Sequence, residues 1–187
     1  DHRDLHLSLR RQRQMCIRDR GYAARTGALA ARGRFVLLTD ADLSTPVQEV
    51  TRLLGWARAG VPVVIGSRKI PGARVLRHQP PWREWMGKVF SLLARMMLVP
   101  EVNDFTCGFK LFRGAWVGPL FSRLRRDDWS YDAELLFVAR RLGARIKEVP
   151  VTWLDDPDSR VRPLRAALGS LLGLLAIRLG ALLGRYD

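Results

Sequence analysis

Short apolar runs alternate along the chain with longer segments of helical periodicity. The runs at 35–38 (FVLL) and 63–65 (VVI) are uninterrupted and end at polar or glycine residues, which is typical of strands buried on both faces of a sheet. Between them, apolar side chains recur at helical spacing over 47–57, and Pro46 stands at a favoured first-turn position. A strand, a helix and a strand in this order predict a βαβ unit with parallel strands.

The rest of the pattern extends this unit into a domain. Further helices are predicted over 22–32, 82–99 and 131–142, and further strands over 107–112 and 146–153. Residues 70–81 are rich in proline and arginine and predict a long basic loop. Because Pro150 has no amide hydrogen, we expect the last strand at an edge. The sequence therefore predicts an α/β fold, a mostly parallel sheet with helices on both faces.

The last part of the chain combines leucines at helical spacing with arginines. Only twelve residues separate Arg165 from Arg178, too few to cross a bilayer core. We therefore predict that 159–187 forms a basic amphipathic helix lying at a membrane interface. A helix packed back on the domain is the open alternative. The earlier predicted helix at 82–99 is expected to be a plain core helix.

Composition limits the possible partners. A chain of 187 residues with 48% hydrophobic content can bury a core and form one globular domain. The formal net charge of +14 indicates an anionic partner: a nucleic acid, an anionic membrane surface or phosphorylated substrates. The two cysteines provide neither a disulfide framework nor metal-ligand spacing, which suits a reducing compartment.

The first twenty residues differ from the rest. They are rich in Arg and Gln, lack periodicity, and end in the hexapeptide MCIRDR at 15–20, which resembles a translated sequencing adapter. A natural basic tail is the alternative. In both cases we expect 1–20 to be a non-native or disordered tail that packs little apolar surface.

Two carboxylates follow the first apolar run directly. Asp40 and Asp42 stand just past the predicted strand end, where open α/β sheets bind ligands. Aspartates at i and i+2 can hold Mg²⁺ or Mn²⁺ and leave coordination sites for a diphosphate, although an isolated Asp-x-Asp is also common in helix caps and turns. Arg68 follows the next strand, and its planar fork suits phosphate oxygens. We expect Asp40, Asp42 and Arg68 at one edge of the sheet.

Five blocks carry a resemblance to a known family. They are GALAARGRFVLLTDADLSTP (27–46), VVIGSR (63–68), DFTCGFKLFR (104–113), WSYDAELLFVARRLG (129–143) and VRPLR (161–165). In this order they resemble the family 2 glycosyltransferases that load sugars onto polyprenyl phosphates, most closely the dolichyl-phosphate β-glucosyltransferase branch. The resemblance implies a GT-A (Rossmann-like) fold, with Asp40 and Asp42 as the metal-binding motif and Gly66, Ser67 and Arg68 as the phosphate-side motif.

The front of the chain departs from that family. Its members begin with a strand and an acidic residue that hold the nucleotide base, and nothing in 1–21 resembles them. We therefore expect a catalytic domain over 21–158 that lacks its first βα unit. Such a fragment would keep the metal centre and is expected to be unstable or inactive by itself.

The resemblance also implies a reaction. A sugar, with glucose expected, would pass with inversion from a nucleotide-diphosphate sugar such as UDP-glucose to a polyprenyl (dolichyl-type) phosphate, in a peripheral enzyme at the cytoplasmic face of a membrane. The acceptor phosphate has a second pKa of about 6 and needs no strong base. Candidates for orienting groups or a weak base are Asp104, Asp132 and Glu134. Candidates for receiving the acceptor phosphate are Lys110, Arg160 and Arg162, and Ser159 is expected beside them in the substrate site as a helix cap.

Three alternatives stay open. One is transfer of mannose or another sugar by the same family. A sugar nucleotidyltransferase would share the metal aspartates and a similar sheet. A non-catalytic basic module for membrane or nucleic acid explains the charge but not the two carboxylates at a strand end. No aromatic-studded basic strand, helix-turn-helix or zinc pattern is present, so we do not expect nucleic acid as the partner.

Overall fold

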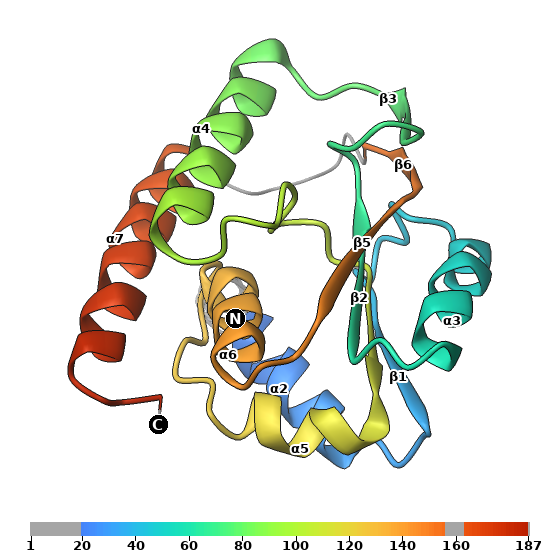
Figure 1. The fold of residues 1–187 in the computed structure, drawn as a ribbon. Coiled ribbons are helices and arrows are strands. Elements are labelled where there is room, and N and C mark those ends of the chain that lie inside the picture. The colour runs from blue at the N-terminus through green and yellow to red at the C-terminus, as the bar shows by residue number, and fades with distance from the viewer. Residues whose placement is uncertain (1–19, 156–162, 187) are drawn as a thin grey trace, which may run out of the picture.

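The computed structural model describes residues 20–155 and 163–186, and side chains of the last helix from residue 169 onward. The described part is an α/β fold (Figure 1). Its elements are α2 (Arg20–Ala30), β1 (Phe35–Leu38), η1 (Val47–Glu49), α3 (Val50–Arg58), β2 (Val63–Ser67), β3 (Arg74–Arg77), α4 (Pro81–Met97), β4 (Lys110–Arg113), α5 (Gly114–Phe121), α6 (Tyr131–Arg141), β5 (Ile146–Pro150), β6 (Thr152–Leu154) and α7 (Pro163–Leu182).

The central sheet has four strands in the order β1-β4-β2-β5. Strands β1, β2 and β5 run in the same direction, and β4 runs antiparallel between β1 and β2. Three of the four strands therefore share one direction, as predicted, and β4 makes the sheet mixed. The chain enters β4 at the edge where β1 and β2 end, since Lys110 is paired with both Leu38 and Ile65. The segment leading into β4 thus meets the ends of β1 and β2 at one edge.

Helices cover both faces of this sheet, as predicted. Val63 and Ile65 of β2 belong to the cluster that packs against α2, α5 and α6, whereas Val64 faces the cluster around α3. All three valine and isoleucine side chains are fully buried. Figure 1 shows α3 on one side of the sheet and α2, α5 and α6 on the other side. Helix α5, with Pro119 in its interior, has no counterpart among the predicted elements.

The strands at the two ends of the sheet differ from the expected pattern. Strand β1 is half-buried rather than fully buried, because it lies at one end of the sheet order. The predicted strand at 146–153 is divided at Val151 into β5, which forms the other end of the sheet as Pro150 suggested, and β6. Strand β6 is paired in parallel with β3, and β3 lies inside the segment predicted as a loop. The predicted loop at 70–81 is therefore partly a strand.

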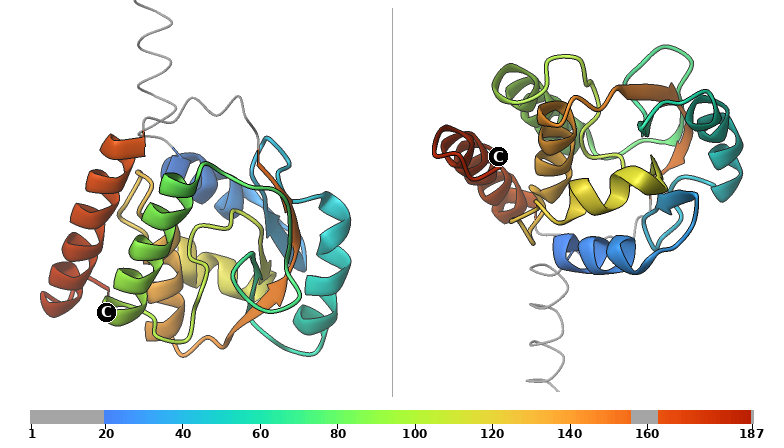
Figure 2. Two further views of the ribbon diagram at one scale, coloured as in Figure 1. Left: turned by 90° about the horizontal axis from the view of Figure 1, so that it is seen from above. Right: turned by 60° about the horizontal axis from the view of Figure 1, so that its bottom comes forward.

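Helices α4 and α7 lie side by side along one flank (Figures 1 and 2). Leu174 and Ile177 of α7 are fully buried against the domain. A Cβ atom at Gly173 would collide with Ser130, so glycine permits this close approach. The inner face of α7 is thus packed back on the domain, while several outward leucines remain exposed. No helix in the described ranges combines the length and apolarity needed to cross a bilayer.

Candidate active site at the edge of the sheet

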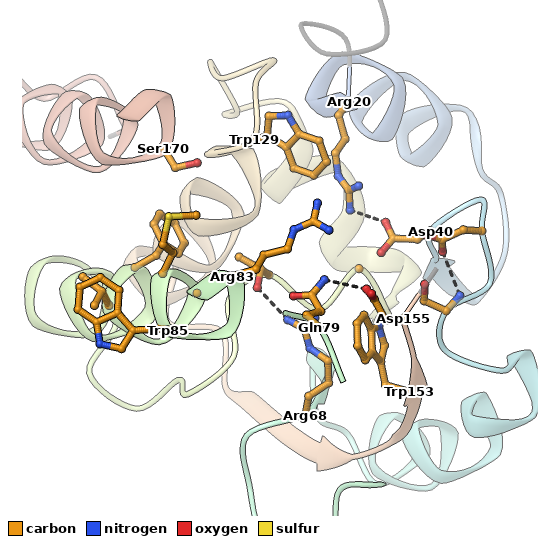
Figure 3. Close-up of a pocket in the computed structure, with 18 of the residues that line it drawn as sticks. Arg20, Asp40, Arg68, Gln79, Arg83, Trp85, Trp129, Trp153, Asp155 and Ser170 are labelled. Carbon is orange, nitrogen blue, oxygen red and sulfur yellow. Dashed lines mark hydrogen bonds and ion pairs between the residues drawn. The ribbon is translucent and has the colours of Figure 1, made fainter. Parts of the chain in front are cut away.

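A pocket of about 430 Å³ opens at the edge where β1 and β2 end (Figure 3). Its lining comes from the turn after β1 (Asp40, Asp42, Ser44), from Arg20, Arg68, Gln79, Thr106, Gly108, Trp129, Trp153 and Asp155, and from α4 and α7 (Arg83, Trp85, Met86, Gly87, Val89, Phe90, Leu93, Ser170, Leu171). The structure thus brings Asp40, Asp42 and Arg68 together at one edge, as the sequence predicted.

A tight turn presents the two aspartates. Oδ1 of Asp42 accepts a hydrogen bond of 3.0 Å from the amide of Ser44, and the amide of Leu43 donates to the carbonyl of Asp40 at 3.1 Å. Leu43 has a φ of 52°, a left-handed conformation that is uncommon outside glycine and asparagine. Such strain is characteristic of functional sites when surrounding contacts hold it. The side chain of Asp42 remains exposed to the pocket.

Gly108 makes room for the carboxylate of Asp40. A Cβ atom at this position would collide with both oxygens of that carboxylate, so any other residue would displace it. Asp40 forms an ion pair with Arg20, whose guanidinium lies 4.7 Å from the centre of the Trp129 ring (Figure 3). Helix α2 begins at Arg20, which was predicted to be the last residue of the 1–20 tail. The other residues of that tail, 1–19, lie outside the described part.

Arg68 reaches the pocket from the end of β2. Its Nε and Nη2 atoms donate to the two oxygens of Asp104, each at 2.8 Å, and Nη2 also donates to Thr106 at 2.8 Å. The guanidinium lies over Trp153, 5.1 Å from the ring centre. Its side chain is 17% exposed, whereas Asp104 is fully buried. Arg68 is therefore held rigidly, with its plane fixed at the pocket.

Asp104 is unsuited to act as a base. Burial by itself would raise the pKa of this carboxyl group, but the charge and hydrogen bonds of Arg68 outweigh burial and hold the pKa well below its usual range. A carboxylate with so low a pKa accepts a proton poorly. The candidate role of Asp104 as a weak base is thus not supported; its contacts make it the residue that positions Arg68.

Glu148 of β5 supports Asp104 in turn. Its Oε1 accepts from the amide of Asp104 at 2.9 Å, and its Oε2 accepts from the amide and the side-chain nitrogen of Asn103 at 3.0 and 2.7 Å. Sequence reasoning missed Glu148. Its only signal was a charged residue within the alternating strand IKEVPVTW.

Lys110 and Asp132 form a buried ion pair away from the pocket lining. Lys110 is fully buried, and its ammonium group binds Asp132 and the carbonyls of Phe105 and Cys107. Strand β4 places Lys110 between the sheet and α6, which explains why it does not line the pocket. The prediction that Lys110 receives an acceptor phosphate does not fit this placement, and Asp132 is likewise occupied by a structural contact.

Glu134 is also structural. This fully buried carboxylate accepts hydrogen bonds from the amides of Arg125 (3.0 Å) and Arg126 (2.9 Å) and from the hydroxyl of Tyr186 (2.6 Å). Burial raises the pKa of Glu134, and these hydrogen bonds offset the rise only in part. The glutamate ties α6 to the preceding loop and to the end of the chain, so its candidate role as a base does not fit its position.

Of the predicted motif Gly66, Ser67 and Arg68, the pocket lining includes Arg68. Gly66 is packed closely, since a Cβ atom there would lie 3.1 Å from Val151 and 3.2 Å from the carbonyl of Phe109. Ser67 is fully buried, and its hydroxyl accepts from the amide of Lys69 at 3.4 Å. Neither residue lines the pocket. Three further predicted residues, Ser159, Arg160 and Arg162, lie outside the described residues.

The donor set fits a divalent cation that is shared with a substrate. Within the described ranges, no three His, Cys, Asp or Glu side chains gather into a metal cluster. A hard cation on Asp40 and Asp42 would complete its coordination with water and phosphate oxygens. Asp40 already accommodates a cationic group, the guanidinium of Arg20. Mg²⁺ or Mn²⁺ is therefore compatible with this pair of carboxylates.

The fold and the position of this pocket define the class of protein. The structure is similar to glucosyl-3-phosphoglycerate synthase from Mycobacterium tuberculosis in complex with uridine diphosphate, with a TM-score of 0.63 and 19% identity over 86% of this chain and 55% of that chain. It is also similar to the same synthase in complex with Mn²⁺ and UDP-glucose, with a TM-score of 0.59 and 20% identity over 87% and 55% of the two chains. The chain thus has a GT-A fold, as the resemblance implied.

The family follows from the sequence. Residues 17–121, more than half of the chain, match Glycosyl transferase family 2, and the chain belongs to this family. Similar proteins include the dolichyl-phosphate beta-glucosyltransferases of Dictyostelium discoideum (27% identity, 89% of this chain, 53% of the relative), Mus musculus (30%, 90%, 54%) and Drosophila melanogaster (32%, 78%, 47%). The chain spans about half the length of these relatives. The predicted resemblance is confirmed.

Proposed function

We propose that this chain carries the metal and diphosphate centre of an enzyme that transfers glucose from a nucleotide-diphosphate sugar to a polyprenyl (dolichyl-type) phosphate. The observation that carries the proposal is the convergence of Asp40, Asp42 and Arg68 on one pocket at the carboxyl edge of the sheet. The names of the similar dolichyl-phosphate glucosyltransferases support this acceptor and sugar. The UDP-glucose and Mn²⁺ named for a structural neighbour support UDP-glucose as the donor.

Each residue at this edge has a distinct task in the proposed reaction. Asp40 and Asp42 would hold Mg²⁺ or Mn²⁺, which would supply a Lewis acid for the leaving diphosphate. Arg68, whose plane Asp104 fixes, offers its guanidinium to the phosphate oxygens. The exposed carboxylate of Asp42 and the half-buried carboxylate of Asp40 face the pocket from one turn, so both can share one cation.

The acceptor needs no proton removed. A phosphate monoester with a second pKa of about 6 is mostly dianionic at neutral pH and is already a nucleophile. Its oxygen forms the new bond to the anomeric carbon while the bond to the diphosphate oxygen breaks, and attack from the opposite face inverts the configuration. This agrees with a site in which Asp104 is held as a poor base and Glu134 is buried away from the pocket. Arg83, which lines the same pocket from the first turn of α4, is a candidate for holding the acceptor phosphate (Figure 3).

The proposed acceptor is a membrane lipid, so we also propose a peripheral position at the cytoplasmic face of a membrane. The support is helix α7, which carries exposed leucines and the exposed residue Arg178. An anionic surface attracts such a basic helix, and its exposed apolar side chains can enter the headgroup region.

The experiment is a transfer assay with a full-length protein that carries these residues. Radiolabelled UDP-glucose and a short polyprenyl phosphate are the substrates, and GDP-mannose serves as the competing donor. We expect a glucosylated lipid phosphate, loss of the product with EDTA and recovery with Mn²⁺ or Mg²⁺. Transfer from GDP-mannose alone would replace glucose by mannose in the proposal. A failure to glycosylate any polyprenyl phosphate would refute the proposed acceptor.

A further inference from the structure

The two-stranded sheet of β3 and β6 places two polar side chains at the pocket. The strands run parallel, with Arg77 paired with Leu154. Asp155 directly follows β6, and Gln79 follows β3 by two residues. Because parallel strands end at the same edge of a sheet, the topology brings these two residues together. The side-chain amide of Gln79 donates to Oδ1 of Asp155 at 2.8 Å (Figure 3), and we call these residues the Gln79–Asp155 pair.

The end of β6 is fixed to the turn that carries the metal-side aspartates. The amide of Leu154, the residue before Asp155, donates to the carbonyl of Ser44 at 2.9 Å. The amide of Ser44 in turn donates to Asp42 at 3.0 Å. Both members of the Gln79–Asp155 pair are half-buried, and both line the pocket. The pair is therefore held at a defined place beside the aspartate turn.

The chemistry of this pair differs from that of the rest of the pocket. Three arginines line the same pocket: Arg20, Arg68 and Arg83. Guanidinium groups suit phosphate oxygens, whereas the carboxylate of Asp155 repels them. Among the described residues, no three carboxylate, histidine or cysteine side chains gather into a metal cluster, so Asp155 stands apart from the two aspartates of the turn. The pair thus fits neither a phosphate nor the cation.

A carboxylate beside an amide suits neutral hydroxyl groups. A hydroxyl donates one hydrogen bond and accepts others, a carboxylate accepts, and an amide does both. The bond between Gln79 and Asp155 uses one carboxylate oxygen and one amide hydrogen. By this inventory, the second carboxylate oxygen, the amide oxygen and the second amide hydrogen can serve a ligand. Adjacent hydroxyls on a sugar ring offer matching donors and acceptors.

The position of the pair agrees with a hexose as that ligand. In the proposed reaction, the transferred hexose lies between the leaving diphosphate and the acceptor phosphate. The diphosphate is assigned to the aspartate turn and to Arg68, and the acceptor phosphate to Arg83. Figure 3 shows the Gln79–Asp155 pair between Arg83 and Asp40. The pair is therefore placed where the hydroxyls of the hexose would lie.

We propose that the Gln79–Asp155 pair binds hydroxyl groups of the transferred hexose and so determines which sugar the pocket accepts. This inference rests on the proposed function for the class of donor, a nucleotide-diphosphate hexose. Asp155 accepts a hydrogen bond from one hydroxyl, and Gln79 binds a neighbouring one. A hexose in which such a hydroxyl is absent or inverted leaves the pair without its partner, which costs binding free energy.

The first test measures binding and needs no acceptor. Isothermal titration calorimetry with Mn²⁺ present gives the Kd of UDP-glucose and the Kd of UDP for a full-length protein that carries these residues. The two ligands share the base, the diphosphate and the cation, so the ratio of their Kd values isolates the hexose. The variants are Asp155→Asn and Gln79→Ala. The matched controls are Asp127→Asn, an aspartate 46% exposed, and Gln48→Ala, an exposed glutamine, both away from the pocket lining.

We expect the Kd of UDP-glucose to rise about tenfold in each variant of the pair, because one hydrogen bond to the hexose is lost. The Kd of UDP should stay within about twofold of the wild-type value, since the pair contacts neither base nor phosphate. Both controls should retain the wild-type ratio. Circular dichroism and thermal unfolding verify that each variant is folded.

A reciprocal exchange separates recognition from a structural role. Gln79→Glu/Asp155→Asn swaps the amide and the carboxylate and keeps a hydrogen bond between the two positions. If the pair only held the end of β3 against β6, this variant would match the wild type in both unfolding temperature and ligand binding. We expect the wild-type unfolding temperature together with a changed ratio of the two Kd values.

Deoxy analogues of UDP-glucose identify the hydroxyl. The Kd is measured for analogues that lack the hydroxyl at C2, C3, C4 or C6, in the wild type and in Asp155→Asn. We expect one analogue to bind the wild type at least about tenfold more weakly than UDP-glucose, and to bind Asp155→Asn with less than about threefold loss. Such non-additivity shows that the carboxylate and this hydroxyl interact.

Two binding results would overturn the inference: a ratio of Kd values that both variants leave unchanged, or additive losses for every analogue. A fall in kcat of Asp155→Asn with an unchanged ratio would instead assign a proton-transfer role to this residue. Failure of the full-length protein to glycosylate any polyprenyl phosphate, with the hexose-dependent binding intact, would refute the proposed acceptor and leave the role of the pair standing.

Discussion

Asp104 holds Arg68 in the pocket by two parallel hydrogen bonds: Nε and Nη2 of the guanidinium each lie 2.8 Å from a different oxygen of the carboxylate. The backbone amide of Arg68 also donates to Asp104, at 3.0 Å. Both oxygens of the carboxylate therefore accept hydrogen bonds from the arginine that it orients. In the proposed function, Arg68 contacts substrate phosphate and Asp104 keeps Arg68 in place.

Asp104→Asn should destabilise the protein by about 3–5 kcal/mol, because removing one partner of a buried pair leaves the other charge uncompensated. Urea unfolding at pH 7 measures the effect. The control is Glu101→Gln, which removes the carboxylate of an exposed pair 3.6 Å from Arg140 and should cost less than about 1 kcal/mol. Equal losses in the two variants would show that the pair with Arg68 is weaker than its geometry implies.

The difference in stability between the wild type and Asp104→Asn should depend on pH. The folded-state pKa of Asp104 lies below the unfolded value of about 3.9, so the unfolded chain binds the proton first as the pH falls. The contribution of ionised Asp104 to the free energy of unfolding is fully present above about pH 4 and is lost progressively as the pH falls below it. Unfolding free energies at pH 7 and pH 3 measure this difference. A gap between the proteins that stays constant down to pH 3 would contradict the depressed pKa.

In a full-length protein that carries these residues, Gly108→Ala should reduce turnover, because the added Cβ atom collides with the carboxylate of Asp40 and must displace it. Gly55→Ala is the control. Its Cβ atom meets nothing within 4 Å in helix α3, and the change should stabilise the helix by up to about 1 kcal/mol. Turnover and the metal concentration for half-maximal rate are measured for both. Unchanged metal dependence in Gly108→Ala would mean that Asp40 does not hold the cation.

Lys110→Met tests whether this lysine is structural or receives the acceptor phosphate. Because Lys110 is fully buried beside Asp132, its removal should cost about 3–5 kcal/mol of unfolding free energy. The exposed lysine Lys88 supplies the control, Lys88→Met, with an expected effect within about 0.5 kcal/mol. The double variant Lys110→Met/Asp132→Leu should recover part of the loss. A Lys110→Met protein that is stable but inactive would restore the phosphate-binding role.

The positions of Asp40 and Asp42 at the end of β1 could be predicted because their signal is local. An apolar run that ends in two aspartates indicates both a strand and its exposed end, so Asp40 and Asp42 could be placed from a few neighbouring positions. The βαβ spacing then fixed the direction of β2 relative to β1, and with it the edge at which Arg68 lies.

The misplaced residues depend on partners far along the chain. The sequence alone does not distinguish a buried lysine from an exposed one, because burial depends on a partner elsewhere in the chain. Lys110 binds Asp132, which lies 22 residues further along the chain. Glu134 binds Tyr186, which lies 52 residues further along. Strand β3 likewise shows no alternation; it forms because Arg74 pairs with Thr152. Helix periodicity at 82–99 cannot tell which face of α4 is buried, so the prediction of a plain core helix misses the exposure of Trp82 and Trp85.

The last prediction concerns Asp42 in a full-length protein that carries these residues. Asp42→Asn keeps an oxygen that can accept from the amide of Ser44, so the turn should stand and stability should change by less than about 0.5 kcal/mol. In the proposed reaction, this variant loses a charge that would hold the cation on the leaving diphosphate. Such a contact is worth about 3 kcal/mol of barrier, so turnover should fall on the order of a hundredfold.

The measurement is glucose transfer from UDP-glucose to a short polyprenyl phosphate, with and without EDTA. The control, Asp127→Asn, changes an aspartate that is 46% exposed and pairs with Arg25 away from the pocket lining, and it should leave turnover unchanged. The metal concentration for half-maximal rate should rise in Asp42→Asn and stay constant in the control. Because stability is nearly unchanged in both variants, a loss confined to Asp42→Asn is a loss of chemistry. Turnover that resists both EDTA and Asp42→Asn would refute the assignment of the cation to this turn.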